Sequence, residues 1–94
     1  MITLEDYRWL FRRAPTMATS IGEDGRYLDV NDALLDRLGY AREDMLGRRP
    51  AEFVTADSAN RIETEFMPIL RRTGRLENKP VNFVSRDGDV VRCT

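Results

Sequence analysis

The sequence predicts an α+β domain in which an antiparallel sheet is flanked by short helices, one longer helix and an N-terminal amphipathic helix. Four short runs typical of strands occur in two pairs, and an Asp-Gly turn joins the members of each pair. Between the pairs, apolar residues recur at helical spacing in segments that end at glycine. The 94 residues are enough for one small domain of this kind.

The N-terminal segment carries the signals of a short amphipathic helix. Thr3, followed by Asp6 three residues later, matches a capping box. Apolar residues then follow helical spacing, at Leu4, Tyr7, Leu10 and Phe11. We predict a helix over residues 4 to about 12. Its apolar stripe either covers the domain's own sheet or pairs with the same helix of a second subunit.

A β-hairpin is predicted next. Two strand-like runs, residues 17–21 and 27–30, surround the turn Glu23-Asp24-Gly25-Arg26. The second run alternates clearly, so that Leu28 and Val30 share one face of the strand and Asp29 lies on the other.

Three short helices are expected after the hairpin. Asn31 caps the first with its side-chain oxygen, and Gly39 ends it in a left-handed conformation. The apolar face of this helix consists of Leu34, Leu35 and Leu38. The second helix spans residues 42–46 and is closed by Gly47, and Pro50 suits the first position of the third.

The longest helix is predicted over residues 58–73, started by Asp57 and ended by Gly74. Its apolar stripe consists of Ala59, Ile62, Phe66, Ile69 and Leu70. Pro68 interrupts this helix, because proline has no N–H to donate and its ring clashes with the carbonyl four residues earlier. We therefore predict a kink or break near Met67.

The C-terminal part contains the second hairpin. The long helix ends with three positive charges, Arg71, Arg72 and Arg75. The helix dipole favours positive charge at this end, so we do not assign these residues to phosphate binding. A strand is predicted over residues 76–85. Because proline cannot donate a hydrogen bond to a neighbouring strand, Pro80 indicates that the first half of this strand lies at a sheet edge or in a bulge. The turn at residues 86–89 leads into a last strand, residues 90–94.

The order of these signals resembles the PAS domain family from about residue 10 to the end of the chain. The resemblance is carried by Pro15, Glu23-Asp24-Gly25-Arg26, Val30-Asn31-Asp32-Ala33, Leu38-Gly39-Tyr40, Glu43-Asp44-Met45-Leu46-Gly47-Arg48 and Arg86-Asp87-Gly88. The family's sheet has five strands, the fifth between the first and the fourth, whereas four are expected here. The resemblance therefore implies a flanking helix over residues 1–13 and a PAS-like domain over residues 14–94 that is incomplete at its C-terminus. Two strand edges would then be bare, which invites pairing with another chain or a stabilising partner.

The resemblance implies a sensory input module of a larger two-component or cyclic-dinucleotide signalling protein. Such a module binds a small ligand between sheet and helices and passes the signal to an output domain of the same parent chain. Our candidates for the pocket are Leu28, Leu35, Leu38, Phe53, Ile62, Phe66, Ile69 and Phe83. The alternative for each of these residues is that it fills a solid core and lines no pocket, and the sequence supports both equally. The alternative function is a ligand-free interaction module that forms a homodimer through Leu4, Tyr7, Leu10 and Phe11.

The amino-acid composition argues against several kinds of cofactor binding and catalysis. The chain has no histidine, so histidine-ligated haem is excluded and the commonest general base is absent. Residues 47–53 lack the cysteine motif of flavin-photosensing relatives, and the single thiol, Cys93, has no activating neighbour in the sequence. We predict no catalytic residue and no metal site, and the identity of any cofactor stays open. Kinase, cyclase or phosphodiesterase activity would belong to other parts of the parent protein.

Charge and hydropathy restrict the classes of partner that the chain is expected to bind. A net charge of −1 does not favour nucleic acid or an anionic membrane. No run approaches the roughly 20 apolar residues of a membrane span, and the acidic N-terminal segment does not match a signal peptide. We expect a cytoplasmic domain, and this expectation is compatible with a membrane anchor in another part of the parent protein.

Overall fold

The computed structural model describes residues 3–73 and 80–93. In chain order, the elements are α1 (Leu4–Arg13), β1 (Thr19–Ile21), β2 (Tyr27–Val30), α2 (Asp32–Leu38), α3 (Arg42–Met45), the 3₁₀ helix η1 (Pro50–Glu52), α4 (Ala56–Arg61), the π-helix η2 (Ile62–Phe66), α5 (Met67–Thr73), β3 (Val81–Val84) and β4 (Val90–Cys93). The α+β class and the four predicted strands are confirmed. Gly74 and residues 76–79, the predicted helix stop and the start of the third strand, lie outside the described residues.

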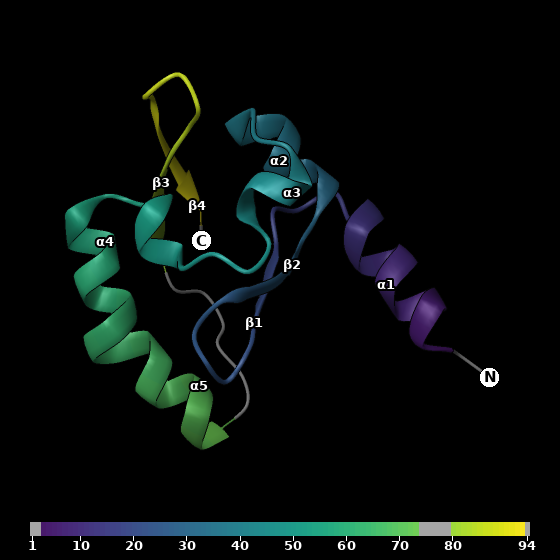
Figure 1. The fold of residues 1–94 in the computed structure, drawn as a ribbon, viewed down its shortest axis with the longest axis horizontal. Helices are drawn as coiled ribbons and strands as arrows, with labels where there is room; N and C mark the ends of the chain where they lie inside the picture. The colour runs from purple at the N-terminus through teal and green to yellow at the C-terminus, as the bar shows by residue number, and fades with distance from the viewer. Residues whose placement is uncertain (1–2, 74–79, 94) are drawn as a thin grey trace.

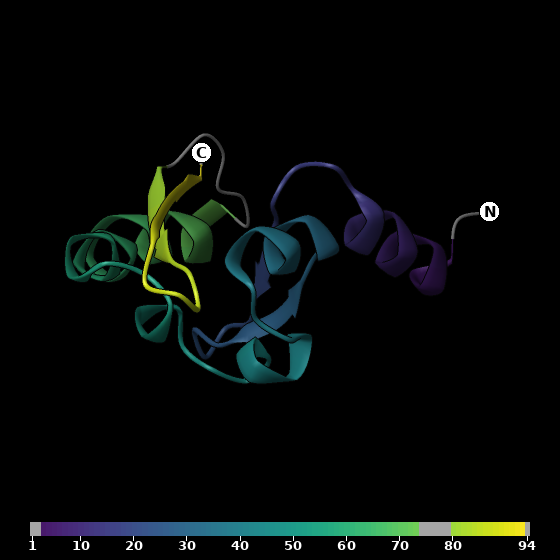
Figure 2. The same cartoon turned by 90° about the horizontal axis from the view of Figure 1, so that it is seen from above.

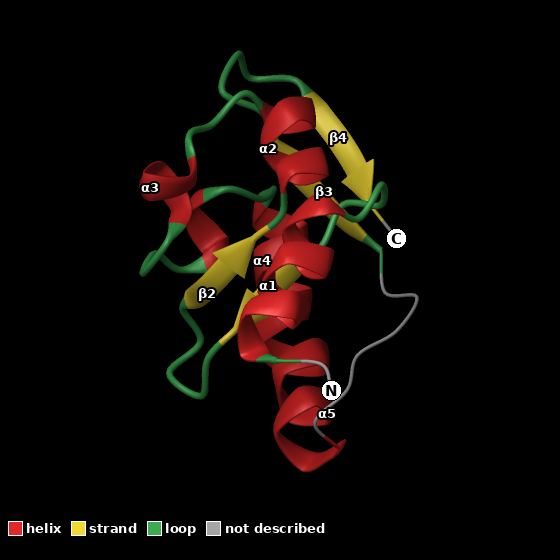
Figure 3. Cartoon of the chain, turned by 90° about the vertical axis from the view of Figure 1, so that its right-hand side faces the viewer, coloured by secondary structure: helices red, strands yellow, loops and turns green. Residues whose placement is uncertain are grey.

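The strands form two separate antiparallel pairs, β1–β2 and β3–β4 (Figure 3). Figures 1 and 2 show α1 at one end of the molecule, α4 and α5 with the β3–β4 pair at the other, and the β1–β2 pair between them. In the described chain, β2 exchanges backbone hydrogen bonds with the loop at Gly47 and Arg48, and β3 exchanges them with the segment around Val54. The other edges, of β1 and β4, pair with no further strand among the described residues.

A β-bulge changes which residues of the first hairpin are buried. Ser20 pairs with Asp29, but the next residue of β1 pairs with Tyr27, so Leu28 is an extra residue on the β2 side. Tyr27 and Val30 are consequently buried, whereas Leu28 is 64% exposed. The prediction that Leu28 and Val30 share one face of the strand is therefore wrong, because a simple alternation of faces does not continue through a bulge.

The capping of α2 is confirmed and does more than start the helix. The Asn31 side chain is fully buried, and its Oδ1 accepts hydrogen bonds from the backbone N–H of Leu34 (3.1 Å) and of Ala18 (3.0 Å). Its amide group donates to the carbonyl of Thr16 at 2.7 Å. Asn31 therefore ties the start of α2 to the chain that leads into β1, and Gly39 ends the helix at φ +84° as predicted.

The long helix begins earlier than predicted and contains the expected irregularity. Thr55, rather than Asp57, is the cap, because its hydroxyl accepts the N–H of Ser58 at 3.3 Å. The five residues of η2 have π-helical geometry, and Met67 donates to the carbonyl of Ile62, five residues back. The wider turn occurs directly before Pro68, which has no N–H with which to continue the α-helical pattern.

One apolar core joins the two hairpins to the helices. It consists of Tyr27, Val30, Leu34, Leu38, Met45, Phe53, Val54, Ile62, Phe66, Met67, Phe83 and Val91. The ring of Tyr40 packs edge-on against Phe53, with 5.1 Å between the ring centroids. Of the helices in residues 3–73 and 80–93, none combines the length and apolar character that crossing a bilayer requires.

Candidate functional site

Most of the residues proposed to line a pocket are core residues. Five of the eight candidates are buried in the common core: Leu38, Phe53, Ile62, Phe66 and Phe83. Leu35 and Ile69 are half-buried, and Leu28 lies on the surface beside α1. Leu28 is thus separated from the other seven. A role of the buried residues in ligand binding stays a prediction.

A cleft opens between the first hairpin and α5. It has a volume of about 290 Å³ and is lined by Ile21, Gly22, Glu23, Met67, Leu70 and Arg71. We call it the α5 cleft. Its hairpin wall is fixed by backbone bonds within the turn, from Gly22 to the carbonyl of Arg26 and from Gly25 to that of Gly22, both at 2.9 Å. Gly25 adopts φ +81°, which this turn requires and which other residues rarely adopt.

The helical wall of the α5 cleft is formed by α5, which begins directly after the π-helical turn. Met67 is the first residue after η2, and Leu70 and Arg71 follow at the spacing that places side chains on one helix face. Met67 is only 4% exposed, and Ile21 and Leu70 are half-buried against the core. The floor of the cleft is therefore apolar and continuous with the core.

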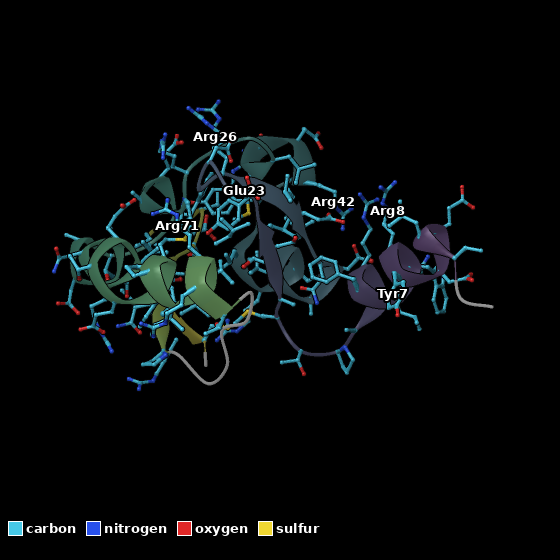
Figure 4. All side chains as sticks on the ribbon, turned by 90° about the horizontal axis from the view of Figure 1, so that it is seen from below. Tyr7, Arg8, Glu23, Arg26, Arg42 and Arg71 are labelled. Atoms are coloured by element: carbon cyan, nitrogen blue, oxygen red, sulfur yellow. The ribbon has the colours of Figure 1, made fainter. Side chains whose placement is uncertain are left out.

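The rim of the α5 cleft is charged. Glu23 and Arg71 are exposed, and no described hydrogen bond or ion pair involves either side chain. Figure 4 labels both residues, one on the hairpin turn and one on α5. The sequence had placed Leu70 in a helix stripe and Arg71 at a helix end. It gave no signal that Ile21 and Met67 would meet across a cleft.

A second hollow, which we call the α1 groove, lies between α1 and the opposite side of the hairpin. It has a volume of about 540 Å³ and is lined by Leu4, Tyr7, Arg8, Phe11, Arg12, Ser20, Leu28 and Asp29. Of the four predicted dimer residues, Leu4, Tyr7 and Leu10 are more than half exposed, and Phe11 is half-buried. Trp9 and Leu28 are two further exposed apolar residues of this region, and neither was predicted to belong to a dimer surface.

Charged side chains attach α1 to the rest of the domain. Arg12 donates from Nε to Asp29 Oδ2 at 3.1 Å, and Arg42 Nε lies 3.5 Å from Asp29 Oδ1. Arg42 also donates from Nη2 to Asp32 Oδ1 at 2.7 Å and to the carbonyl of Val30 at 3.1 Å. We call Arg12, Asp29, Asp32 and Arg42 the Asp29 cluster. It connects α1 with β2, α2 and α3, and Figure 4 shows Arg42 beside the α1 residue Arg8.

The Asp29 cluster also perturbs a carboxyl group. A hydrogen bond from Arg42 and the charges of Arg42, Arg13 and Arg12 hold the pKa of Asp32 below its ordinary value. Burial, by contrast, raises the pKa of the Cys93 thiol, which works against a reactive thiolate. Within the described ranges, no three His, Cys, Asp or Glu side chains gather in a way that would hold a metal ion.

Known structures share this architecture. A PAS domain of an HTR-like protein from Haloarcula marismortui matches with a TM-score of 0.70 and 23% identity, covering 94% of this chain and 71% of that one. A domain of a sensory box sensor histidine kinase/response regulator from Geobacter sulfurreducens gives 0.66, with 24% identity and coverage of 94% and 75%. A PAS domain from Colwellia psychrerythraea gives 0.76, with 16% identity and coverage of 95% and 75%.

The sequence gives the same assignment. No curated protein matches the chain, but the family model described as the PAS fold matches residues 11–77. This match runs from the last turn of α1 through both walls of the α5 cleft and takes in well over half of the chain. The chain therefore belongs to the PAS-fold family.

Proposed function

We propose that this chain is a sensory input module that binds a small molecule in the α5 cleft and passes the signal to an output domain of the same parent chain. PAS domains are sensory modules of histidine kinases and similar signalling proteins. One observation carries the proposal for this chain: the cleft opens where the π-helical turn gives way to α5. Turns of this kind are frequent at functional sites.

The proposed mechanism uses the two walls of the cleft. A ligand that contacts Ile21 on one wall and Leu70 on the other favours one spacing between the hairpin and α5. Such a ligand shifts the population toward the state that it binds better. The π-helical turn before Met67 supplies a local irregularity at which α5 can change its position relative to α4.

Native mass spectrometry tests this proposal. The purified chain should carry an additional mass that is lost on denaturation, and extraction should release the corresponding small molecule. Leu70→Trp should abolish the additional mass, because the larger ring fills the cleft. The matched control is Leu28→Trp, which adds the same volume on the other side of the hairpin. Equal ligand loads in both variants, each folded by circular dichroism, would exclude the α5 cleft as the site.

A second candidate function rests on a different observation. Leu4, Tyr7 and Leu10 are large apolar side chains that remain more than half exposed on α1. In a ligand-free interaction module, a second copy of the chain covers this stripe and forms a homodimer.

Light scattering after size exclusion tests the dimer. The double variant Tyr7→Ser with Leu10→Ser should move the mass from dimer to monomer. Glu5→Ser, on the same helix, should leave the mass unchanged, because it removes no apolar surface from the stripe. A wild-type chain that stays monomeric at high concentration would contradict this second function.

A further inference from the structure

The rim of the α5 cleft carries two opposite charges that form no ion pair with each other. Glu23 lies on the hairpin wall and Arg71 on the helical wall, and within the described structure neither side chain has an ionic or hydrogen-bonding partner. The α1 groove is different, because its Arg12 and Asp29 pair at 3.1 Å. Among residues 3–73 and 80–93, the α5 cleft therefore presents to a ligand one cation and one anion that have no partner there.

The floor and the size of the cleft restrict the ligand further. The apolar lining residues Ile21, Met67 and Leu70 are more buried than the two charged residues, so a bound molecule meets apolar surface once it passes the rim. The volume of about 290 Å³ lies at the low end of the range for small-molecule sites. A compact molecule with both charges at one end and an apolar group at the other matches these features.

We propose that the α5 cleft recognises small zwitterions with an apolar side chain, of which an aliphatic α-amino acid is the simplest member. The ligand carboxylate binds the guanidinium of Arg71, a geometry that arginine favours. The ligand ammonium binds the carboxylate of Glu23, and the side chain packs on Met67 and Leu70. This inference rests on the proposed sensory function and names the ligand class for it.

The arrangement also selects against related molecules. A fatty acid satisfies Arg71 but desolvates Glu23 without a partner, and a simple amine does the reverse. A dianion such as a phosphate monoester has one favourable contact and is repelled by Glu23. The two opposite charges therefore provide specificity that the apolar floor alone lacks.

Isothermal titration of the full chain with three probes tests this inference. The probes are L-leucine, 4-methylpentanoate, which lacks the ammonium, and 3-methylbutylamine, which lacks the carboxylate. Leucine should bind at least about tenfold more tightly than either analogue, because each analogue leaves one charge-assisted hydrogen bond unmade. Arg71→Gln should reduce leucine affinity by about tenfold and remove its advantage over the amine. Glu23→Gln should remove the advantage in affinity that leucine has over 4-methylpentanoate.

Arg72→Gln is the matched control, because Arg72 is the next residue of α5 and does not line the cleft. It should leave leucine binding unchanged. Equal affinities for the three probes would overturn the inference and leave the sensory function standing. The same conclusion follows if none of the probes binds while native mass spectrometry finds another ligand. Absence of binding in both experiments would overturn the inference and the proposed function together.

Discussion

The attachment of α1 through the Asp29 cluster leads to a quantitative prediction for Asp29→Asn. Asparagine has the same shape, and its Oδ1 can still accept the backbone N–H of Val30, which lies at 2.9 Å. The substitution removes the negative charge, which Arg12 approaches at 3.1 Å and Arg42 at 3.5 Å, and it replaces Oδ2, the acceptor for Arg12, with an amide donor. The variant therefore removes the ionic and hydrogen-bonding contribution of Asp29 to the cluster while leaving its packing volume nearly unchanged.

The expected cost follows from the burial of the three side chains. Asp29 is 15% exposed, Arg42 24% and Arg12 36%. Exposed ion pairs contribute about 0–1 kcal/mol, and removing one partner of a buried pair costs about 3–5 kcal/mol. A partly buried cluster lies between these limits, so we expect Asp29→Asn to lower the free energy of unfolding by about 2 kcal/mol. For a domain of this size, the corresponding fall in Tm is about 8–16 °C.

Calorimetry and far-UV circular dichroism measure this effect. Because a detached helix of ten residues is marginal in water, the signal of α1 should also weaken below the main transition. A double-mutant cycle with Arg12→Gln should give a coupling energy of about 1 kcal/mol that decreases with added salt. The control, Glu65→Gln, breaks the exposed pair with Arg61 at 3.4 Å and should cost about 0.3 kcal/mol. An unchanged Tm and zero coupling for Asp29→Asn would refute an ionic attachment of α1.

Three further predictions concern buried or perturbed groups. Asn31→Ala should cost about 3 kcal/mol in urea unfolding, because it removes a helix cap and leaves the partly buried N–H of Ala18 without its acceptor. Asp32 has a lowered pKa, so its stabilising contribution is present above about pH 4 and is lost as the pH falls further. Asp32→Asn should accordingly show a flatter decline of the urea midpoint in acid than the wild type. Burial raises the pKa of Tyr27, so one of the three tyrosines should form phenolate only as the chain unfolds in alkali.

Local signals in the sequence predicted most of the elements correctly. The Thr3 capping box, the Asn31 cap and the left-handed Gly39 each depend on residues within a few positions of one another. The effect of Pro68 was also predictable, because it follows from a missing N–H and a steric clash. Its form, a π-helical turn ending at Phe66, was not, since a proline only requires that the regular pattern be interrupted.

Features that depend on distant parts of the chain were not predictable. The bulge at Leu28 depends on how β1 pairs with β2, and alternation within β2 contains no information about that pairing. Thr55 replaces Asp57 as a helix cap because the segment before α4 is held against β3, where the N–H of Thr55 donates to the carbonyl of Asn82 at 2.9 Å. The α5 cleft depends likewise on the meeting of residues that are far apart in the sequence, 21–23 on the hairpin and 67–71 on the helix.

The first hairpin connects the two candidate surfaces of this protein. Ser20 lines the α1 groove and the next residue, Ile21, lines the α5 cleft, because successive strand residues point to opposite faces. Ser20 is also the residue that pairs with Asp29, the centre of the ionic attachment of α1. A ligand that displaces β1 at Ile21 therefore acts one residue away from the pairing that positions Asp29. The two proposed functions, ligand binding and subunit contact, are therefore compatible with each other, because a single short strand forms part of both surfaces.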